Sequence, residues 1–289
     1  MVTTMTTPPP PHRPAAGDDE TGRQTLLILG ASGDLTARLL LPGLGALIAT
    51  GDVPDLFLVG AGMEDWDDQR WRGRVHDSFA TVRPSDARAA TVADQARYLC
   101  ADVTREQDLR RLLDACEGRV VIYFALPPAI TATACAALRG VPLPPGTRLV
   151  LEKPFGTDAA TAHSLNELLV QLVPEDQIHR VDHFLGKSTV LNILGLRFAN
   201  RIFEPVLNNT HVASVDVVFD EDLALEGRAR YYDHAGALVD MVQSHLLQVL
   251  ALLAMDAPPT LHARELRDRK AEVLRATRLW ADDPAASSR

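Results

Sequence analysis

The chain has 289 residues, of which 46% are hydrophobic and 23% are charged, and its formal net charge at pH 7 is −9. No apolar run reaches the roughly 18 residues of a membrane-spanning helix, so we expect no contact with a membrane. The acidic balance argues against a nucleic-acid-binding protein, because such proteins usually carry a basic surface.

Residues 1–23 are rich in proline and acidic side chains and lack the apolar core of a signal peptide, so a disordered tail is expected there. Three cysteines (Cys100, Cys116 and Cys135) form neither a CxxC pair nor an even-numbered disulfide framework. They indicate reduced thiols in a cytoplasmic protein. No group of histidines and cysteines has the spacing of a zinc site, and we expect no metal.

Apolar runs and helical segments alternate from residue 24 onward. Strands are predicted at 25–29, 56–60, 98–100, 120–125 and 148–151, and helices at 35–50, 64–97, 106–116 and 129–139. This alternation is typical of right-handed crossovers in a doubly wound parallel sheet. We therefore predict an α/β fold in which residues 24–180 form a Rossmann-like dinucleotide-binding domain.

The pattern changes after about residue 158. Helices are predicted at 159–172, 187–200, 235–255 and 263–275, with a short extended segment at 177–181 and one alternating strand at 211–219. A single strand cannot form a sheet. Residues 181–289 are therefore interpreted as an incomplete α+β domain for substrate binding and dimerisation.

A glycine-containing turn follows the first strand and reads Gly30-Ala31-Ser32-Gly33-Asp34-Leu35. Glycines let backbone N–H groups approach a pyrophosphate, and the start of the next helix adds partial positive charge. Such a turn can also be purely structural. Its position directly after the first strand of an alternating chain favours a dinucleotide site.

The end of the second strand bears on the choice between NAD and NADP. An acidic residue there accepts hydrogen bonds from a ribose 2′-OH, whereas an arginine pairs with a 2′-phosphate. Glu64 and Asp65 follow this strand without an adjacent arginine, and Arg70, Arg72 and Arg74 come later. Alternatively, the two acids only cap a helix near Trp66.

Further blocks appear in a fixed order along the chain. They are Glu152-Lys153-Pro154-Phe155-Gly156, Arg180-Val181-Asp182-His183-Phe184-Leu185-Gly186-Lys187, Glu226-Gly227-Arg228, Tyr231-Tyr232-Asp233, and the segment 240–248 with the sequence DMVQSHLLQ. Together with the glycine turn, they resemble glucose-6-phosphate dehydrogenases from about Leu26 to Lys270. The resemblance implies hydride transfer from C1 of β-D-glucose 6-phosphate to NADP or NAD, the first reaction of the pentose phosphate pathway.

Oxidation of a sugar hemiacetal needs a base for the hydroxyl proton. On a helical wheel, His245 borders a polar stripe of Asp240, Gln243, Ser244 and Gln248, where a histidine is more often a core residue. The resemblance implies that His245 is the base and that Asp182 orients it. A carboxylate in that place holds the imidazole tautomer and stabilises the imidazolium.

His183 and Lys187 are four residues apart around a glycine, a spacing that suits a phosphate as well as a solvated loop. The resemblance implies that both bind the 6-phosphate and that Pro154 is a cis proline. It assigns the sugar hydroxyls to Lys153, Glu221 and Asp240, with Lys153 also near the nicotinamide, and the cofactor turn to Gly30, Ser32, Gly33, Asp34 and Leu35.

Two positions depart from the family pattern. Phe184 stands where the family usually has a tyrosine, which removes a possible hydrogen bond to phosphate. Met63 stands where NADP-preferring relatives carry the arginine for the 2′-phosphate. We therefore expect dual cofactor use or a preference for NAD.

Relatives continue well beyond the helix that corresponds to 263–275 and build a large antiparallel sheet that forms their dimer interface. A homo-oligomer is expected for the family, but most of that interface sheet is missing here, and we expect low or no activity of this chain alone. Glucose 6-phosphate is the expected partner. The alternatives are another Rossmann sugar oxidoreductase and a non-catalytic nucleotide-binding or regulatory fragment.

Overall fold

The computed structural model of the chain describes residues 22–82, 86–156, 158–200, 202–220, 236 and 238–278. The chain divides into two compact units, and the division falls between Val181 and Asp182. In the described residues, no helix combines the length and the apolar character needed to cross a membrane.

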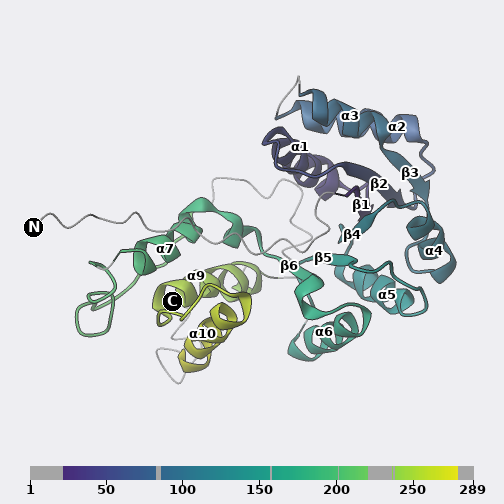
Figure 1. The fold of residues 1–289 in the computed structure, drawn as a ribbon. Coiled ribbons are helices and arrows are strands. Elements are labelled where there is room, and N and C mark those ends of the chain that lie inside the picture. Colours follow the sequence, from purple (N-terminus) through teal and green to yellow (C-terminus); the bar gives the residue numbers. More distant parts are fainter. Residues whose placement is uncertain are drawn as a thin grey trace, which may run out of the picture. The chain divides into compact units, whose positions relative to one another are not determined.

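The first unit is built on a six-stranded sheet in which every neighbouring pair of strands is parallel. The spatial order is β3-β2-β1-β4-β5-β6. The strands are β1 (Gln24–Leu29), β2 (Leu56–Gly62), β3 (Arg97–Cys100), β4 (Arg119–Phe124), β5 (Arg148–Glu152) and β6 (Ile178–Val181) (Figure 1). The order reverses between β1 and β4, and ligands of such sheets bind outside the carboxyl ends of the strands at this point. The predicted doubly wound parallel sheet is confirmed.

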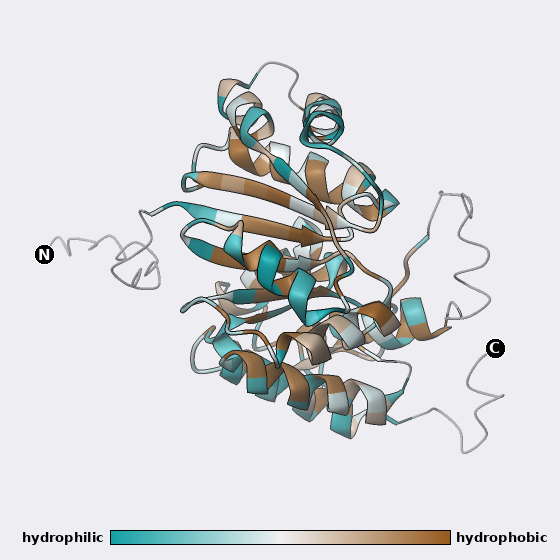
Figure 2. Cartoon of the chain, turned by 90° about the vertical axis from the view of Figure 1, so that its right-hand side faces the viewer, coloured by the Kyte–Doolittle hydropathy of each residue, from teal (hydrophilic) through white to brown (hydrophobic). Residues whose placement is uncertain are grey.

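Helices cover both faces of this sheet (Figure 1). Leu27 and Leu29 of β1 pack into a core with α4, α5 and α6, whereas Ile28 between them packs into a core with α1, α2 and α3. The apolar character of consecutive strand residues is clear in Figure 2. A strand buried on both faces is apolar throughout. The helices are α1 (Leu41–Ala49), α2 (Asp68–Ala80), α3 (Ala87–Gln95), α4 (Glu106–Asp114), α5 (Pro128–Leu138) and α6 (Ala159–Leu172), and a π-helical turn, η1 (Thr36–Leu40), precedes α1.

Acidic residues start three of these helices. The carboxylate of Asp67 accepts the amide hydrogen of Arg70 at 2.8 Å and caps α2, and Asp86 caps α3 in the same way. Asp158 and Thr161 form a reciprocal capping box at the start of α6. Each cap satisfies a backbone N–H that has no partner within its helix, which stabilises the helix by about 1 kcal/mol.

The sheet contains one parallel strand more than the alternation indicates. The segment predicted only as extended, at 177–181, contains β6, which follows the short 3₁₀ turn η2 (Glu175–Gln177) and pairs with β5 from Leu149↔Ile178 to Glu152↔Val181. The five strands predicted from 25–29 to 148–151 are therefore one short of the six that the sheet contains. Four residues are too few for a periodic pattern, and β6 becomes recognisable only when α6 is placed as its crossover.

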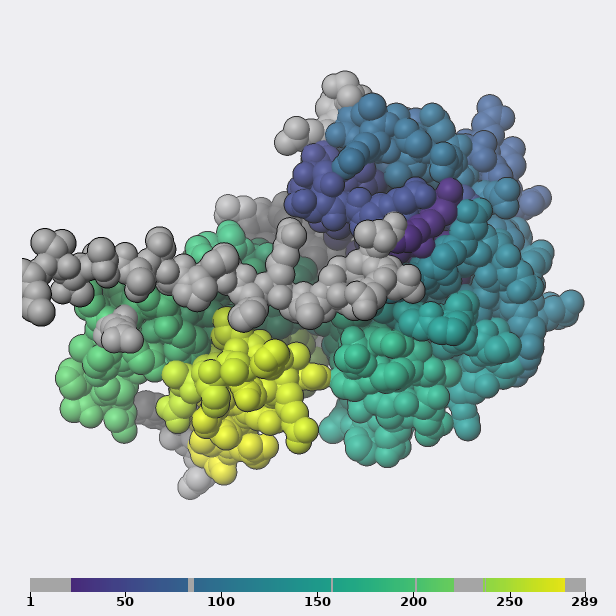
Figure 3. All heavy atoms as spheres, viewed as in Figure 1, coloured from purple at the N-terminus to yellow at the C-terminus, as the bar shows by residue number. Residues whose placement is uncertain are grey.

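The described part of the second unit is helical. It contains a 3₁₀ turn, η3 (His183–Gly186), a π-helix, η4 (Leu238–Leu246), and the helices α7 (Ser188–Phe198), α9 (Leu247–Ala254) and α10 (Ala263–Ala276). Val190, Leu252 and Met255 form its small core. The buried guanidinium of Arg197 donates to the carbonyls of Leu252 and Met255, at 3.2 and 2.6 Å, near the end of α9. Helix α10 has no fully buried residue, and its atoms form the yellow surface in Figure 3.

The strand predicted at 211–219 is not formed. No strand occurs in the residues described after Val181, and the alternating apolar positions at Val215 and Phe219 are 49% and 38% exposed. Alternation defines a face, but a strand also needs a neighbour that pairs its N–H and C=O groups. No such neighbour stands beside this segment among the described residues.

Candidate active site

The glycine turn after β1 lies at the reversal point of the sheet. Gly30 has φ +89°, and a Cβ atom there would lie 2.1 Å from the carbonyl oxygen of Ala125, which follows β4. The amides of Gly30 and Ala31 both donate to the carbonyl of Ala61 at 2.9 Å. Only glycine fits this position, which has a positive φ and a close backbone neighbour. The turn is thus fixed between the ends of β2 and β4.

The rest of the turn leads into a helix. The Gly33 amide donates to the Gly30 carbonyl at 3.0 Å, and Leu35 is the residue before η1. The exposed carboxylate of Asp34 pairs with Arg38 at 3.5 Å. Ser32 and Gly33 therefore stand at the beginning of a helix whose N–H groups and partial positive charge can hold a pyrophosphate.

The residues after β2 surround this turn. Glu64 accepts a short hydrogen bond from the Ser32 hydroxyl, while the Met63 side chain is 70% exposed. The guanidinium groups of Arg70 and Arg74 lie over the Trp66 ring, 4.7 and 4.8 Å from the ring centroid. The capping alternative for Glu64 is wrong, because α2 is capped by the aspartate at position 67 and Glu64 bonds to the cofactor turn instead.

One arginine lies near the turn in the fold although it is far from it in the sequence. Arg74 Nη1 lies 3.5 Å from the carbonyl oxygen of Ser32, although the two residues are 42 positions apart. Arg74 belongs to α2, whose other side packs toward the sheet through Trp71 and Val75. The residues next to Met63 include no arginine, but α2 returns the chain to the turn and places Arg74 beside it.

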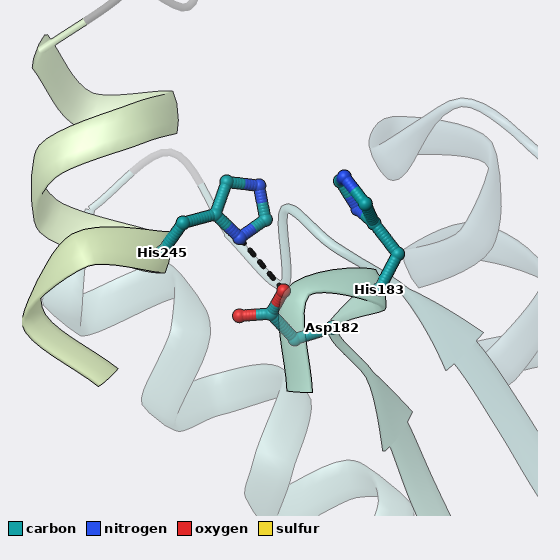
Figure 4. A group of neighbouring side chains, drawn as sticks. All are labelled: Asp182, His183 and His245. Carbon is teal, nitrogen blue, oxygen red and sulfur yellow. Dashed lines mark ion pairs between the residues drawn. The ribbon is translucent and has the colours of Figure 1, made fainter. Parts of the chain in front are cut away.

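The second unit brings His245 and Asp182 together. Asp182 is its first residue, and His245 is the last but one of η4. His245 Nδ1 lies 2.7 Å from Asp182 Oδ1 (Figure 4). The histidine is only 1% exposed, and the aspartate side chain 13%. The two atoms are within hydrogen-bonding distance, and they form an ion pair only when the imidazole is protonated. The sequence places these two residues 63 positions apart, and the fold pairs them.

Asp182 has a second structural role. Its Oδ1 also accepts the amide hydrogen of Phe184 at 3.0 Å, which caps the short helix η3. The carboxylate that contacts His245 is therefore anchored to the backbone of the segment that carries His183. An anchored partner fixes the orientation of an imidazole better than a mobile one.

An aromatic side chain stacks on the imidazole of His245. The rings of Phe184 and His245 are stacked, with centroids 4.0 Å apart and an interplanar angle of 15°. Phe219 meets Phe184 edge-on at 4.8 Å. Sequence reasoning treated Phe184 only as a tyrosine without its hydroxyl and missed this contact. No periodicity reveals it, because the partners lie on η3 and η4.

The helix that carries His245 is wider than an α-helix. Residues Leu238–Leu246 form a π-helix, and the Ser244 hydroxyl donates to the Val239 carbonyl five residues earlier, at 3.0 Å. The wider turn brings residues five apart closer to one face, so Asp240 and His245 lie nearer to each other than an α-helical wheel indicates. His245 is buried, which agrees with the expectation that a histidine at this border is more often a core residue. Single π turns are common at functional sites.

The candidate phosphate ligands lie on the same short segment. His183 is exposed, and its ring is edge-on to that of His245, with centroids 4.7 Å apart and an angle of 75°. Lys187 Nζ lies 4.9 Å from the Phe184 centroid and 5.0 Å from that of Phe219. The fold thus brings His183 and Lys187 close to the His245–Asp182 pair within one unit.

The remaining candidate residues are divided between the units. Lys153 follows β5 in the first unit, and its peptide bond to Pro154 is cis, as expected. Asp240 is half-buried in η4 of the second unit. Glu221 lies outside the described residues.

One further residue interacts with the His245–Asp182 pair, and no sequence motif indicates it. Lys270 of α10 donates to Gln248 Oε1 at 3.0 Å. Burial lowers the pKa of Lys270, with a further lowering by Arg267 and an opposing effect of Asp182. Lys270 is thus an interior cation that interacts electrostatically with the partner of His245. In the sequence it is one of many charges on a polar helix.

Comparison with known proteins identifies the family. Residues 27–192 match the family described as "Glucose-6-phosphate dehydrogenase, NAD binding domain", and residues 194–288 match "Glucose-6-phosphate dehydrogenase, C-terminal domain". The chain belongs to the glucose-6-phosphate dehydrogenase family. The glucose-6-phosphate 1-dehydrogenases of Gluconobacter oxydans (strain 621H) and Bacillus subtilis (strain 168) are 42% and 39% identical to it over 273 and 274 residues. Each match covers 90% of this chain and 56% of the relative, so the chain spans about half the length of these dehydrogenases.

Two solved structures of glucose-6-phosphate dehydrogenases superpose on this chain. A glucose-6-phosphate dehydrogenase in complex with its substrate glucose 6-phosphate superposes with a TM-score of 0.80 at 31% identity, over 91% of this chain and 57% of that one. A glucose-6-phosphate 1-dehydrogenase from Mycobacterium avium gives a TM-score of 0.79 at 34% identity, over 88% of this chain and 56% of that one. The expected family and fold of the dehydrogenase are therefore confirmed.

Proposed function

We propose that this chain carries the site of a glucose-6-phosphate dehydrogenase, which oxidises C1 of β-D-glucose 6-phosphate and yields 6-phosphoglucono-lactone. The observation that carries the proposal is the buried His245, 2.7 Å from Asp182 and next to a segment with two basic side chains. Family membership and the substrate complex of a structural relative support it. The reaction would be the first step of the pentose phosphate pathway.

His245 acts as the general base. Its Nδ1 faces Asp182, so Nε2 is the nitrogen that takes the proton from the C1 hydroxyl. The negative charge of Asp182 stabilises the imidazolium that forms, and the stacked ring of Phe184 holds the imidazole plane. A nicotinamide held beside this site would supply the acceptor for the hydride that C1 loses.

Basic and polar side chains bind the sugar phosphate. His183 and Lys187 bind the 6-phosphate, and Lys153, Glu221 and Asp240 bind the sugar hydroxyls. Both phosphate ligands come from the segment that Asp182 caps, so they are positioned together with the base. Charge-assisted hydrogen bonds of this kind are roughly twice as strong as neutral ones.

The cofactor occupies the turn formed by Gly30, Ser32, Gly33, Asp34 and Leu35, with Lys153 near the nicotinamide. We propose that the chain uses both cofactors and prefers NAD. Glu64 bonds to Ser32 at this turn and suits a ribose 2′-OH, while its charge repels a 2′-phosphate. Arg74 lies close to the same turn and keeps NADP usable.

We place the protein in the cytoplasm and expect it to act without nucleic acid or membrane, as a homo-oligomer. All three cysteines are free thiols, and burial raises the pKa of Cys116 and of Cys135 to about 12. Thiols of this kind are inert packing residues, which suits a reducing compartment.

A single-turnover experiment tests the proposed reaction. The 289-residue chain, in excess over glucose 6-phosphate, is mixed with NAD or NADP, and absorbance of the reduced nicotinamide is followed. Because low activity is expected of this chain alone, we expect slow reduction that depends on the sugar phosphate and is lost in His245→Asn. Free glucose and other phosphorylated sugars serve as controls for a different sugar oxidoreductase. A chain that binds both ligands by calorimetry yet reduces no cofactor contradicts the proposal and favours a non-catalytic nucleotide-binding protein.

A further inference from the structure

Three side chains that transition metals accept as ligands meet in the second unit. Asp182, His183 and His245 each offer one ligand atom, and these three atoms lie within 4.8 Å of one another (Figure 4). Asp182 Oδ1 and His245 Nδ1 are already 2.7 Å apart. We propose that these residues bind a Zn²⁺ ion, with water completing its coordination.

The donor set selects zinc over the common hard cations. Two imidazole nitrogens and one carboxylate oxygen suit Zn²⁺, whereas Mg²⁺ and Ca²⁺ prefer oxygen ligands throughout. Three protein ligands plus water is the usual arrangement of an open zinc site. Spacing along the sequence conceals this site, because 62 positions separate His183 from His245 while their ring centroids are 4.7 Å apart.

Closing the site requires small movements of its side chains. Ligands of a tetrahedral zinc ion lie about 3.3 Å apart at zinc–nitrogen distances near 2.0 Å. Atoms as far apart as 4.8 Å must therefore approach each other, and Asp182 Oδ1 and His245 Nδ1, now 2.7 Å apart, must separate slightly to admit the ion. His183 is exposed, and its ring meets His245 edge-on, so a change of rotamer can bring it in. His245 is buried under Phe184 and serves as the fixed ligand.

Neighbouring groups organise the site and limit its affinity. The Phe184 amide anchors the carboxylate of Asp182, as second-shell hydrogen bonds do in zinc sites. Lys187 holds its ammonium group over the Phe184 ring, 4.9 Å from the centroid, which places a positive charge close to the incoming cation. Removal of that charge by Lys187→Met should therefore tighten zinc binding.

Bound zinc would interfere with the proposed reaction, an inference that rests on the proposed function. The ion takes up the imidazole that accepts the proton, the carboxylate that orients it and the histidine assigned to the phosphate. Zinc and glucose 6-phosphate should therefore exclude each other. The metal site itself rests only on the three ligands and stands independently of the dehydrogenase reaction.

Cobalt binding tests the site directly, because four-coordinate Co²⁺ absorbs visible light and replaces zinc. We titrate the 289-residue chain with Co²⁺ and then add Zn²⁺. We expect one equivalent of a four-coordinate cobalt spectrum that zinc abolishes. His183→Asn should weaken binding by about tenfold or more, since one of three ligands is lost. Because His183 is exposed, the His183→Asn variant tests the site without creating a cavity in the protein interior.

The pair formed by His76 and Asp94 is a matched control. Its Nε2–Oδ1 distance is also 2.7 Å, and no third ligand joins it among the residues that the structure describes. His76→Asn should leave cobalt binding unchanged. A cobalt spectrum that survives His183→Asn, or that disappears in His76→Asn, overturns the proposed site. If zinc binds but glucose 6-phosphate fails to displace it, the site stands and the overlap with the substrate is refuted.

Discussion

The imidazole of His245 lies nearly parallel to the ring of Phe184, with centroids 4.0 Å apart and planes at 15°. Stacking of this kind contributes about 0.5–1.5 kcal/mol beyond the burial of area. That energy is enough to favour one orientation of the imidazole about its side-chain bonds. The imidazole of His245 is thus contacted by two groups at the start of η3: the carboxylate of the capping Asp182 beside its Nδ1 and the phenyl ring of Phe184 against its face.

Replacement of Phe184 by leucine should slow the proposed reaction. Phe184→Leu keeps an apolar side chain but removes the stacked surface, so the imidazole samples unproductive orientations. We expect kcat to fall about tenfold, equivalent to about 1.4 kcal/mol, with little change in the KM of the cofactor. Phe184→Tyr is the control, because it keeps the ring and should keep kcat. An unchanged kcat in Phe184→Leu would show that the stacking does not orient the base.

Substitution of Asp182 separates its charge from its capping role. Asn is as good a helix cap as Asp, so Asp182→Asn should keep η3 folded while it removes the negative charge beside His245. We expect kcat to fall by about 10²–10⁴-fold, because the imidazolium loses its partner and the tautomer is no longer fixed. Steady-state kinetics with both substrates measures this.

Two variants complete the Asp182 experiment. Asp182→Ala removes the cap as well and should also raise the KM of glucose 6-phosphate, since the segment with His183 and Lys187 loosens. Asp94→Asn removes the carboxylate of the exposed His76 pair and should leave both constants unchanged. Equal kinetics for wild type and Asp182→Asn would refute the role of this carboxylate.

Glu64 should decide the choice of cofactor. Glu64→Gln keeps a partner for the Ser32 hydroxyl but removes the charge that repels a 2′-phosphate. A charge pair near the surface is worth about 1 kcal/mol at 4 Å in water, so the ratio of kcat/KM for NADP to that for NAD should rise about fivefold. Asp65→Asn, one residue further on, is the control and should change the ratio little. A wild type with at least about tenfold higher kcat/KM for NADP than for NAD would contradict the proposed preference.

Lys270 should make the free energy of unfolding depend on pH in the alkaline range. Burial lowers the pKa of its ammonium group below the ordinary value of 10.5. Between the folded and unfolded pKa values, the unfolded chain binds more protons than the folded one, so the free energy of unfolding rises with pH in that interval. Below the folded pKa this contribution is constant.

Urea unfolding of variants isolates the Lys270 contribution. The difference in unfolding free energy between wild type and Lys270→Met should shift in favour of wild type as pH rises from about 7 to about 10. Lys270→Arg stays protonated throughout, so its difference from Lys270→Met should show no such rise. A pH-independent difference between wild type and Lys270→Met would mean that burial does not shift this amine.

The sheet was predictable because each central strand is an apolar run followed by glycine or proline. β1 and β4 are buried on both faces, and that pattern survives without knowledge of their neighbours. β6 was identified only as an extended segment, since an edge strand of four residues has no period of its own. The predicted strand at 211–219 failed for the opposite reason: its period is clear, but it has no partner among the described residues.

The sequence motifs indicated which residues belong to the candidate site, but they did not indicate the contacts that the fold adds around those residues. His245 and Asp182 were expected together by resemblance, and the fold brings them to 2.7 Å. The contact of Arg74 with Ser32 and the stacking of Phe184 depend on where helices turn back, which residue spacing does not encode. The π-helical turn also shifts the residues after it relative to an α-helical wheel, so the wheel places Asp240 and His245 farther apart than the π-helix does.

A single oxygen atom, Asp182 Oδ1, contacts both the imidazole of His245 and the amide that begins η3. Loss of this oxygen, as in Asp182→Ala, would therefore affect both the proposed proton transfer and the proposed phosphate binding. A variant selected for weaker or tighter substrate binding through Asp182 would inherit an altered base, so adaptation of affinity has to come from Lys187 or from residues beyond η3.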